Sequence, residues 1–107
     1  MRAEDLLQAH SVWCEGTVLL HLAGELDLAT APLVENAVAA CLAGRPRHIL
    51  LDLADLTFCD GTGLRALRRV TDRVHAAGVA LCLTGVHPHL ERSLDHHLGS
   101  PSPSPRL

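Results

Sequence analysis

The sequence predicts an α/β domain, and three observations support that class. Apolar runs of strand length alternate with segments whose apolar residues recur at helical spacing. Glycine, proline or threonine stands at the boundaries between these segments. After two consecutive strands the order becomes helix, strand, helix, strand, helix, which implies parallel neighbours joined by right-handed crossovers. We expect a layered domain with a mostly parallel central sheet, an N-terminal hairpin and helices packed on the sheet.

The first two strands are predicted to form the hairpin. Residues 6–14 are a weak strand candidate, and Glu15-Gly16 supplies a turn. Residues 17–23 (TVLLHLA) are almost continuously apolar, which predicts a strand buried mostly on both faces.

A helix is predicted between the second and third strands. Thr30 and Pro32 mark its start, because a threonine hydroxyl can cap unpaired N–H groups and proline is tolerated in the first turn. Gly44 and Pro46 end it. Its single apolar stripe consists of Leu33, Val34, Ala37, Val38 and Cys41.

The second half of the chain repeats the pattern. Residues 48–53 (HILLDL) are the best candidate for a central strand, since they are short, almost continuously apolar and bounded by turn residues. A helix follows over residues 61–77, with an apolar stripe on one side and arginines around the rest. Residues 79–84 form another buried strand, and residues 89–94 a shorter helix.

The composition fits one globular domain. The chain has 107 residues, of which 48% are apolar and 20% charged, so a packed core is expected over residues 1–99. Residues 100–107 (SPSPSPRL) cannot form helix or core and are expected to be a disordered tail. A net charge of −3 and only two aromatic residues argue against nucleic acid as a partner.

The cysteines and the N-terminus indicate a cytoplasmic protein. The four cysteines lie far apart in or beside apolar runs, which is typical of buried free thiols in a reducing compartment. The first residues lack the pattern of a signal peptide, and no apolar stretch is long enough to insert into a membrane.

The turn between the third strand and the second long helix is the most informative segment. Asp60-Gly61-Thr62-Gly63 places polar and glycine residues where a helix begins, and a helix N-terminus favours a capping carboxylate, a hydroxyl or a phosphate. The structural alternative is that Asp60 or Thr62 only caps the helix while the glycines permit a tight turn. Both roles can coexist in one exposed turn.

Three segments together resemble the STAS domains and, among them, the bacterial anti-sigma factor antagonists. They are residues 22–31 (LAGELDLATA), residues 50–64 with their Leu-Leu-Asp-Leu and Phe-Cys-Asp-Gly-Thr-Gly-Leu motifs, and residues 77–86. Their order and spacing match the family over residues 6–98. The resemblance implies a regulator that binds an anti-sigma factor kinase of the histidine-kinase ATPase fold and so frees a sigma factor.

The resemblance also implies a regulatory phosphorylation, from which this chain departs. In the family, the first serine of an Asp-Ser-Ser-Gly-Leu-like turn is phosphorylated, and the added charge breaks the interface. Gly61 stands at that position and has no hydroxyl, whereas Thr62 stands at the second. Either phosphorylation has moved to Thr62, or the protein is a constitutive binder.

The expected partner surface combines the turn with its neighbours. Asp27 corresponds to a family position beside the phosphorylation turn, although it can also be a turn aspartate bonded to its own backbone. The arginines of the following helix are either a solvated face or a basic stripe that selects an acidic partner. The whole set is Asp27, Asp60, Gly61, Thr62, Gly63, Arg65, Arg68 and Arg69.

Other functions have weaker support. A different role for the same family is an accessory STAS subunit of a membrane transport complex, such as a lipid-transport ATPase, and a third is a nucleotide sensor. The terminal element looks shortened against the family, and exposed apolar surface there would favour a homodimer or burial by a partner.

Catalysis and metal binding are not expected. The sequence has no nucleophile elbow, phosphate-binding loop or zinc-protease motif, so we predict neither an enzyme nor a bound cofactor. Four histidines near the C-terminus are too loosely spaced to predict a metal site: His87, His89, His96 and His97.

Overall fold

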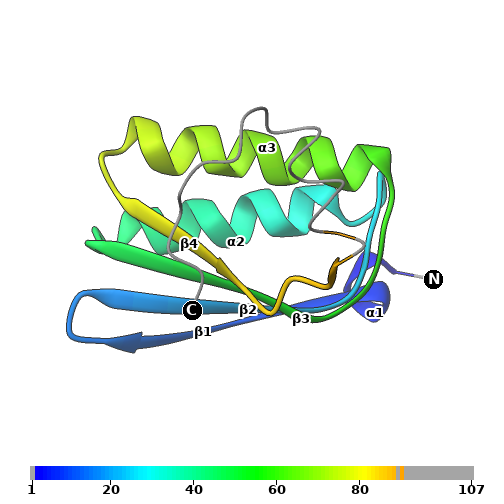
Figure 1. Ribbon diagram of the computed structural model, residues 1–107, viewed down its shortest axis with the longest axis horizontal. Coiled ribbons are helices and arrows are strands. Elements are labelled where there is room, and N and C mark those ends of the chain that lie inside the picture. The colour runs from blue at the N-terminus through cyan, green and yellow to red at the C-terminus, as the bar shows by residue number, and fades with distance from the viewer. Residues whose placement is uncertain (1, 89, 91–107) are drawn as a thin grey trace.

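The fold is a four-stranded mixed sheet with two long helices (Figure 1). The computed structural model describes residues 2–88 and 90. The strands lie in the order β1-β2-β3-β4; β1 and β2 pair antiparallel, whereas β2, β3 and β4 are parallel. The predicted class is therefore confirmed, and so is the predicted order from the first strand to the fourth. The elements are α1 (Ala3–Leu6), β1 (Leu7–Cys14), β2 (Thr17–Leu26), α2 (Ala31–Ala43), β3 (His48–Cys59), α3 (Gly61–Ala76) and β4 (Ala80–Thr84).

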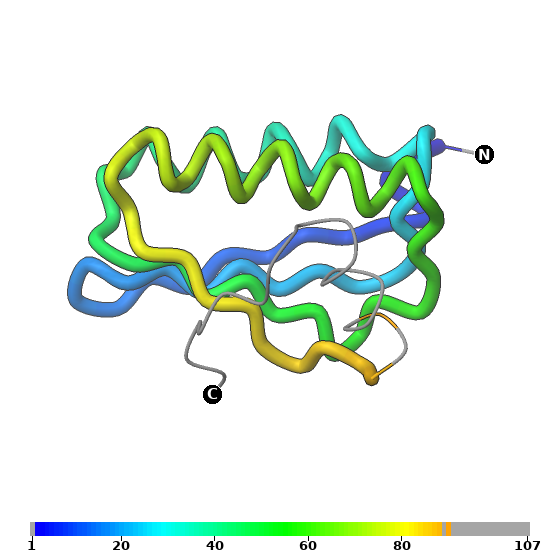
Figure 2. The backbone as a smooth tube through the Cα atoms, turned by 45° about the horizontal axis from the view of Figure 1, so that its top comes forward, coloured from blue at the N-terminus to red at the C-terminus, as the bar shows by residue number. Residues whose placement is uncertain are grey.

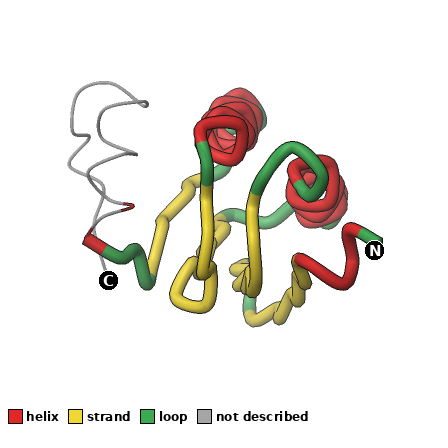
Figure 3. The backbone as a smooth tube through the Cα atoms, turned by 90° about the vertical axis from the view of Figure 1, so that its right-hand side faces the viewer, coloured by secondary structure: helices red, strands yellow, loops and turns green. Residues whose placement is uncertain are grey.

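Both long helices cover the same face of the sheet (Figure 3). Burial along β2 accordingly alternates, with Val18, Leu20 and Leu22 fully buried and the residues between them only partly buried. The prediction that this strand is buried mostly on both faces is wrong, because in the described part of the chain neither long helix covers the second face. The helix-side core is completed mainly by Val34, Val38, Ile49, Leu51, Leu53, Leu67, Val70 and Val74.

A two-residue turn joins β1 to β2. Glu15 and Gly16 both have positive φ, 47° and 81°, as a type I′ hairpin turn requires. Cys14 pairs with Thr17, and the ladder then continues without a shift to Leu7 and Gly24. The predicted hairpin and its turn are confirmed.

The start of α2 lies where the sequence predicts it, but Thr30 has another role. The Thr30 side chain is completely buried and makes no capping bond to the helix. Its hydroxyl instead donates to the Glu25 carbonyl (2.8 Å) and accepts from the Asp27 N–H (3.0 Å). The predicted cap is therefore wrong: the hydroxyl bonds backbone groups at the end of β2 and just after it.

The end of α2 also agrees with the sequence, for a different reason. The helix stops before Gly44, but Gly44 has φ −80°, and Arg45 is the residue with positive φ (54°). A Cβ atom on Gly44 would lie 2.6 Å from the Trp13 ring. Glycine is thus needed because the indole of β1 packs directly against this position.

In the second half of the chain, the structure differs from the prediction mainly in the length of one strand. The strand β3 continues six residues beyond the predicted Leu53, with register shifts against β2 near its end. The predicted helix agrees with α3 to within one residue, and β4 begins one residue late. The short helix α1 was not predicted. The predicted helix over residues 89–94 and the tail over 100–107 fall largely or wholly outside the described residues.

Candidate partner-binding site

Two strand-to-helix turns lie side by side at one end of the sheet (Figure 2). The parallel strands β2 and β3 end together, since Leu26 pairs with Cys59, and each strand leads into a helix that starts at this end. The Asp60 N–H donates to the Leu26 carbonyl (3.3 Å) and joins the two turns. The fold thus brings the Asp27 turn and the Asp60 turn together, as expected for carboxyl ends of parallel neighbours.

Asp60 is the N-cap of α3. Its backbone is extended, and its carboxylate accepts the Gly63 N–H at 2.8 Å, which satisfies one of the unpaired donors of the first turn. The predicted capping role is confirmed. The negative charge also lies at the positive end of the helix dipole.

The two glycines of this turn have opposite surroundings. A Cβ atom on Gly63 would lie 2.5 Å from the Leu26 carbonyl oxygen and 2.9 Å from the Cys59 Sγ, so the residue must be small. Gly61 is exposed, and a Cβ there would meet only the flexible Arg65 side chain, at 3.7 Å. The packing of the turn therefore requires glycine at 63 but leaves room for a side chain at 61.

Asp27 organises the neighbouring turn through its own backbone. Its Oδ1 accepts the Ala29 N–H (2.9 Å) and the Thr30 N–H (3.2 Å), and its carbonyl accepts the Ala31 N–H (2.9 Å). The alternative of a turn aspartate bonded to its own backbone is confirmed. Ala29 is exposed and Asp27 partly exposed, so the turn remains accessible.

Thr62 lies in the first turn of α3 and is partly buried. The Arg65 guanidinium donates to its hydroxyl at 3.3 Å in an exposed contact. The basic side chain of Arg65 thus lies beside the hydroxyl of Thr62, the residue that follows Gly61.

The arginines further along α3 are paired with carboxylates. Arg69 Nε lies 2.7 Å from Glu35 Oε1 of α2, and Arg68 Nε lies 3.9 Å from Asp72 Oδ2 on its own helix. These side chains are about half exposed, so the pairs contribute little to stability. Their charges are nonetheless partly neutralised, and Arg65, nearest the turn, is the basic residue in contact with Thr62.

Two apolar side chains at this end were missed by the sequence reasoning. Leu28, in the turn after β2, is 75% exposed, and Phe58, one residue before the end of β3, is 50% exposed. The sequence offered two signals for these residues: a leucine between turn residues and the only phenylalanine of the chain. Exposed apolar groups beside polar turns are typical of protein interaction surfaces.

The turn offers no activated nucleophile. Burial, with a smaller contribution from the Asp60 charge, raises the pKa of the Cys59 thiol to about 11, so the thiol is protonated at neutral pH. His87 contacts the Ala54 carbonyl (3.1 Å) away from the turn, and the other three C-terminal histidines lie outside the described residues. Among the residues that the structure describes, no group of three or more histidine, cysteine or acidic side chains can hold a metal ion.

A separate polar cluster lies on the sheet face opposite the helices. His21 Nδ1 is 2.9 Å from Asp52 Oδ2, and His21 Nε2 is 3.0 Å from Asp55 Oδ2. The hydrogen bond with Asp52 and the two negative charges raise the pKa of His21 despite some desolvation. The pKa of Asp52 is lowered, chiefly by the backbone hydrogen bond from Ala54.

The sequence pattern of the STAS domain matches residues 12–97. The match covers most of the chain, including β2, β3, β4, both long helices and the two adjacent turns. The protein therefore belongs to the STAS domain family, as its resemblance indicated.

The proteins similar to the chain include two curated relatives and one solved structure. The anti-sigma-F factor antagonist RsfB of Mycobacterium tuberculosis is 28% identical over 74 residues, which are 69% of this chain and 61% of RsfB. The anti-sigma F factor antagonist of Paenibacillus polymyxa is 30% identical over 81 residues, 75% of this chain and 69% of that protein. An anti-sigma factor antagonist from Mycobacterium paratuberculosis superposes with a TM-score of 0.73 at 23% identity, covering 95% of this chain and 92% of that one. This last likeness shows the fold alone, and the chain spans about three fifths of the length of RsfB.

Within residues 2–88 and 90, no helix is both long and apolar enough to cross a membrane.

Proposed function

We propose that the protein is an anti-sigma factor antagonist, a non-enzymatic regulator of transcription that acts in the cytoplasm. It binds an anti-sigma factor, a kinase of the histidine-kinase ATPase fold, and so frees a sigma factor. The names of the related proteins support the role, and the exposed pair of turns supports the place of binding. The observation that carries the proposal is the accessible N-terminus of α3 at Gly61, directly beside the turn of Asp27 and Leu28.

The proposed docking surface comprises both turns and the first turns of α3. Leu28 and Phe58 supply apolar area that a partner can bury, and Asp60 and Arg65 supply charges at its rim. Arg65, Arg68 and Arg69 orient an acidic partner and increase the rate of association more than the affinity. The proposed contact set is Asp27, Asp60, Gly61, Thr62, Gly63, Arg65, Arg68 and Arg69.

Gly61 stands at the position where family members carry the phosphorylated serine. Because glycine has no hydroxyl, the protein is a constitutive binder. The surroundings of Gly61 do not exclude a serine, because a Cβ there meets only the Arg65 side chain. Thr62 is the alternative acceptor: its hydroxyl lies in the first turn of the helix beside the Arg65 guanidinium, which can pair with a phosphate.

Affinity capture from the native cytoplasm with ADP present, followed by mass spectrometry, tests the identity of the partner. We expect an anti-sigma factor kinase to be recovered. Recovery of a membrane transport ATPase alone would contradict the proposal and assign the chain to accessory STAS subunits of lipid transport instead.

Titration of the purified kinase with two matched variants tests the docking surface. Gly61→Asp places a negative charge in the turn, and Gly61→Asn adds a side chain of nearly the same shape without charge. We expect the first to weaken binding about tenfold or more and the second to change it little. Equal effects of both variants, or none, would place the interface elsewhere.

Incubation with the kinase and ATP then decides between the two forms of regulation. Gly61→Ser is expected to become phosphorylated at residue 61 and to lose binding, whereas the unmodified chain keeps it. Phosphate on Thr62 of the unmodified chain, abolished by Thr62→Val, would replace the constitutive binder with a switch at Thr62.

A further inference from the structure

Among the residues that the structure describes, no strand pairs with the outer side of β1, and this edge lacks the usual protection against pairing with another strand. The strand is eight residues long and contains no charged residue and no proline, and its ladder with β2 has no bulge. Natural edge strands are commonly interrupted by such features, because their unpaired N–H and C=O groups attract other strands. At the opposite edge, β4 has only five residues.

The backbone groups that point outward from β1 can be identified from the hairpin. A two-residue type I′ turn makes Cys14 and Thr17 a pair that exchanges both backbone hydrogen bonds, and bonded and non-bonded pairs alternate from there. Ala9, Ser11 and Trp13 are therefore the central residues whose N–H and C=O groups point away from β2.

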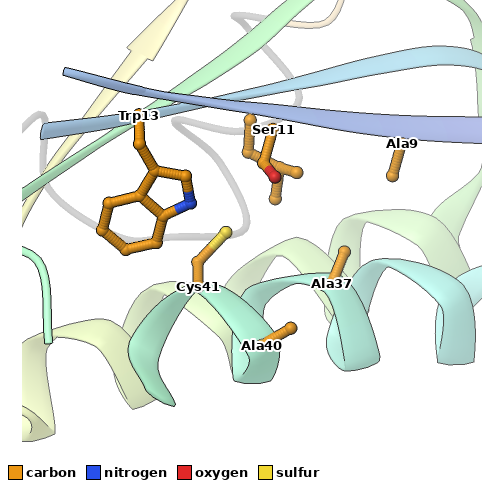
Figure 4. Close-up of a pocket in the computed structure, with 7 residues that line it drawn as sticks. Ala9, Ser11, Trp13, Ala37, Ala40 and Cys41 are labelled. Carbon is orange, nitrogen blue, oxygen red and sulfur yellow. The ribbon is translucent and has the colours of Figure 1, made fainter. Parts of the chain in front are cut away.

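The side chains of the same three residues point toward α2 and line a groove beside it (Figure 4). The groove has a volume of about 410 Å³. Trp13 is 45% exposed and is held against Gly44 at one end. Apart from the buried Leu20, the other lining side chains are small, so the groove has the large indole at one end and free space at the other. Its lining comprises Ala9, Ser11, Trp13, Leu20, Ala37, Ala40 and Cys41.

This arrangement is self-complementary. In an antiparallel pair of two β1 strands centred on Ser11, the outward-pointing groups of Ala9 meet those of Trp13, and Ser11 meets its own copy. Each indole then lies opposite the small Ala9 of the other copy, at the open end of that copy's groove. On the other sheet face Val12, which is 63% exposed, lies opposite His10.

We infer that β1 pairs with β1 of a second copy of this chain, so that two four-stranded sheets form one continuous sheet. Each chain carries a net charge of −3, but the copies meet along an uncharged strand, which avoids like-charge contact at the centre of the interface. The partner-binding turns lie at the carboxyl ends of β2 and β3 and take no part in this contact. The inference is independent of the proposed function.

Sedimentation velocity over a concentration series reaching about 1 mM tests the dimer. We expect a reversible species of twice the 11.5 kDa chain mass, and a blue shift of the fluorescence of Trp13, the only tryptophan, as it forms. Ser11→Lys places two ammonium groups opposite each other and is expected to raise the dissociation constant at least tenfold. The matched control Ser11→Thr keeps a neutral hydroxyl and should dimerise like the unmodified chain. Because Ser11 is exposed, both variants should show unchanged thermal unfolding as monomers.

Disulfide cross-linking tests the register. Gln8 lies opposite Cys14 of the other copy, in a pair whose Cα atoms are about 4.5 Å apart, so Gln8→Cys should give a covalent dimer under mild oxidation. Gln8→Cys combined with Cys14→Ser should not, and nor should the unmodified chain, because like residues at 8 or 14 would be about 20 Å apart. A chain that stays monomeric, a dimer insensitive to Ser11→Lys, or equal cross-linking with and without Cys14 would each overturn the inference.

Discussion

The two turns at the end of the sheet each contain a threonine, and the two threonines are held in opposite ways. Thr30, after β2, is completely buried, and its hydroxyl is bonded to two backbone groups. Thr62, after β3, is partly exposed, and its hydroxyl contacts the exposed Arg65 guanidinium. The same residue type in equivalent connections therefore serves the fold in one turn and remains available to another molecule in the other.

The glycines of the second turn show the largest expected difference. Gly63→Ala forces a Cβ against the rigid Leu26 carbonyl, and we expect a loss of about 3 kcal/mol in the free energy of unfolding. Gly61→Ala places the same group in open space within the helix and should be neutral or slightly stabilising. Urea denaturation of both variants measures the difference. Equal losses would mean that residue 61 is packed as tightly as residue 63.

The two threonines should show the next largest difference in stability. Thr30→Val leaves the Glu25 carbonyl and the Asp27 N–H without their partner, so we expect a loss of about 2 kcal/mol. Thr62→Val removes only an exposed contact and should change stability by less than about 0.5 kcal/mol. Chemical denaturation under identical conditions compares them. A similar cost for both would show that Thr62 is also a structural residue.

The Asp60 cap has a smaller effect. Asp60→Ala leaves the Gly63 N–H without its acceptor and should lower the free energy of unfolding by about 1 kcal/mol. Asp60→Asn keeps an acceptor oxygen and separates the hydrogen bond from the charge, so it should retain most of that stability. Thermal unfolding at neutral pH distinguishes the two. If Asn is as costly as Ala, the charge at the helix dipole, rather than the hydrogen bond, stabilises this turn.

The smallest expected effect is a pH dependence of stability that comes from His21. It should be the same in both threonine variants. The raised pKa of His21 means that its contribution to stability is complete below the ordinary value of 6.5 and is lost as the pH rises through the raised value. Raising the pH from about 5 to about 8.5 should therefore reduce stability by about 0.5 kcal/mol, and His21→Gln should remove this change. Denaturation midpoints across the pH range test this. Asp52, whose pKa is lowered, acts in the opposite direction: its contribution is lost only as the pH falls below 3.8 and through the lowered value.

The order of elements and the start of α3 were predictable because they depend on local patterns. Helical spacing of apolar residues predicted α3 to within one residue, and Asp60 was one of the two N-cap candidates, with Thr62. The extension of β3 to Cys59 was not predictable in the same way. After Leu53 only Leu56 is fully buried, so the alternation is weak, and pairing with β2 keeps the segment extended.

The same division between local patterns and long-range contacts applies to the candidate site. Its polar members were visible in the sequence, because turn aspartates and glycines mark where strands lead into helices. Leu28 and Phe58 were missed, since an apolar residue in a sequence carries no sign of whether the fold buries it. The long outer edge at β1 was equally hidden, because strand order across a sheet depends on contacts between distant segments.

Local sequence patterns were sufficient to predict the fold class, the family and the polar turn at the start of α3, because each depends on residue type at fixed local spacing. The folded chain was needed to show which threonine is buried, why Gly44 must be glycine and which glycine can accept a side chain. The hydroxyl partners of the buried Thr30 are Glu25 and Asp27, a few residues earlier in the chain. The two glycine outcomes, in contrast, depend on atoms from distant segments, the Trp13 ring against Gly44 and the Leu26 carbonyl beside Gly63. Close packing makes such long-range contacts specific, and no local pattern encodes them.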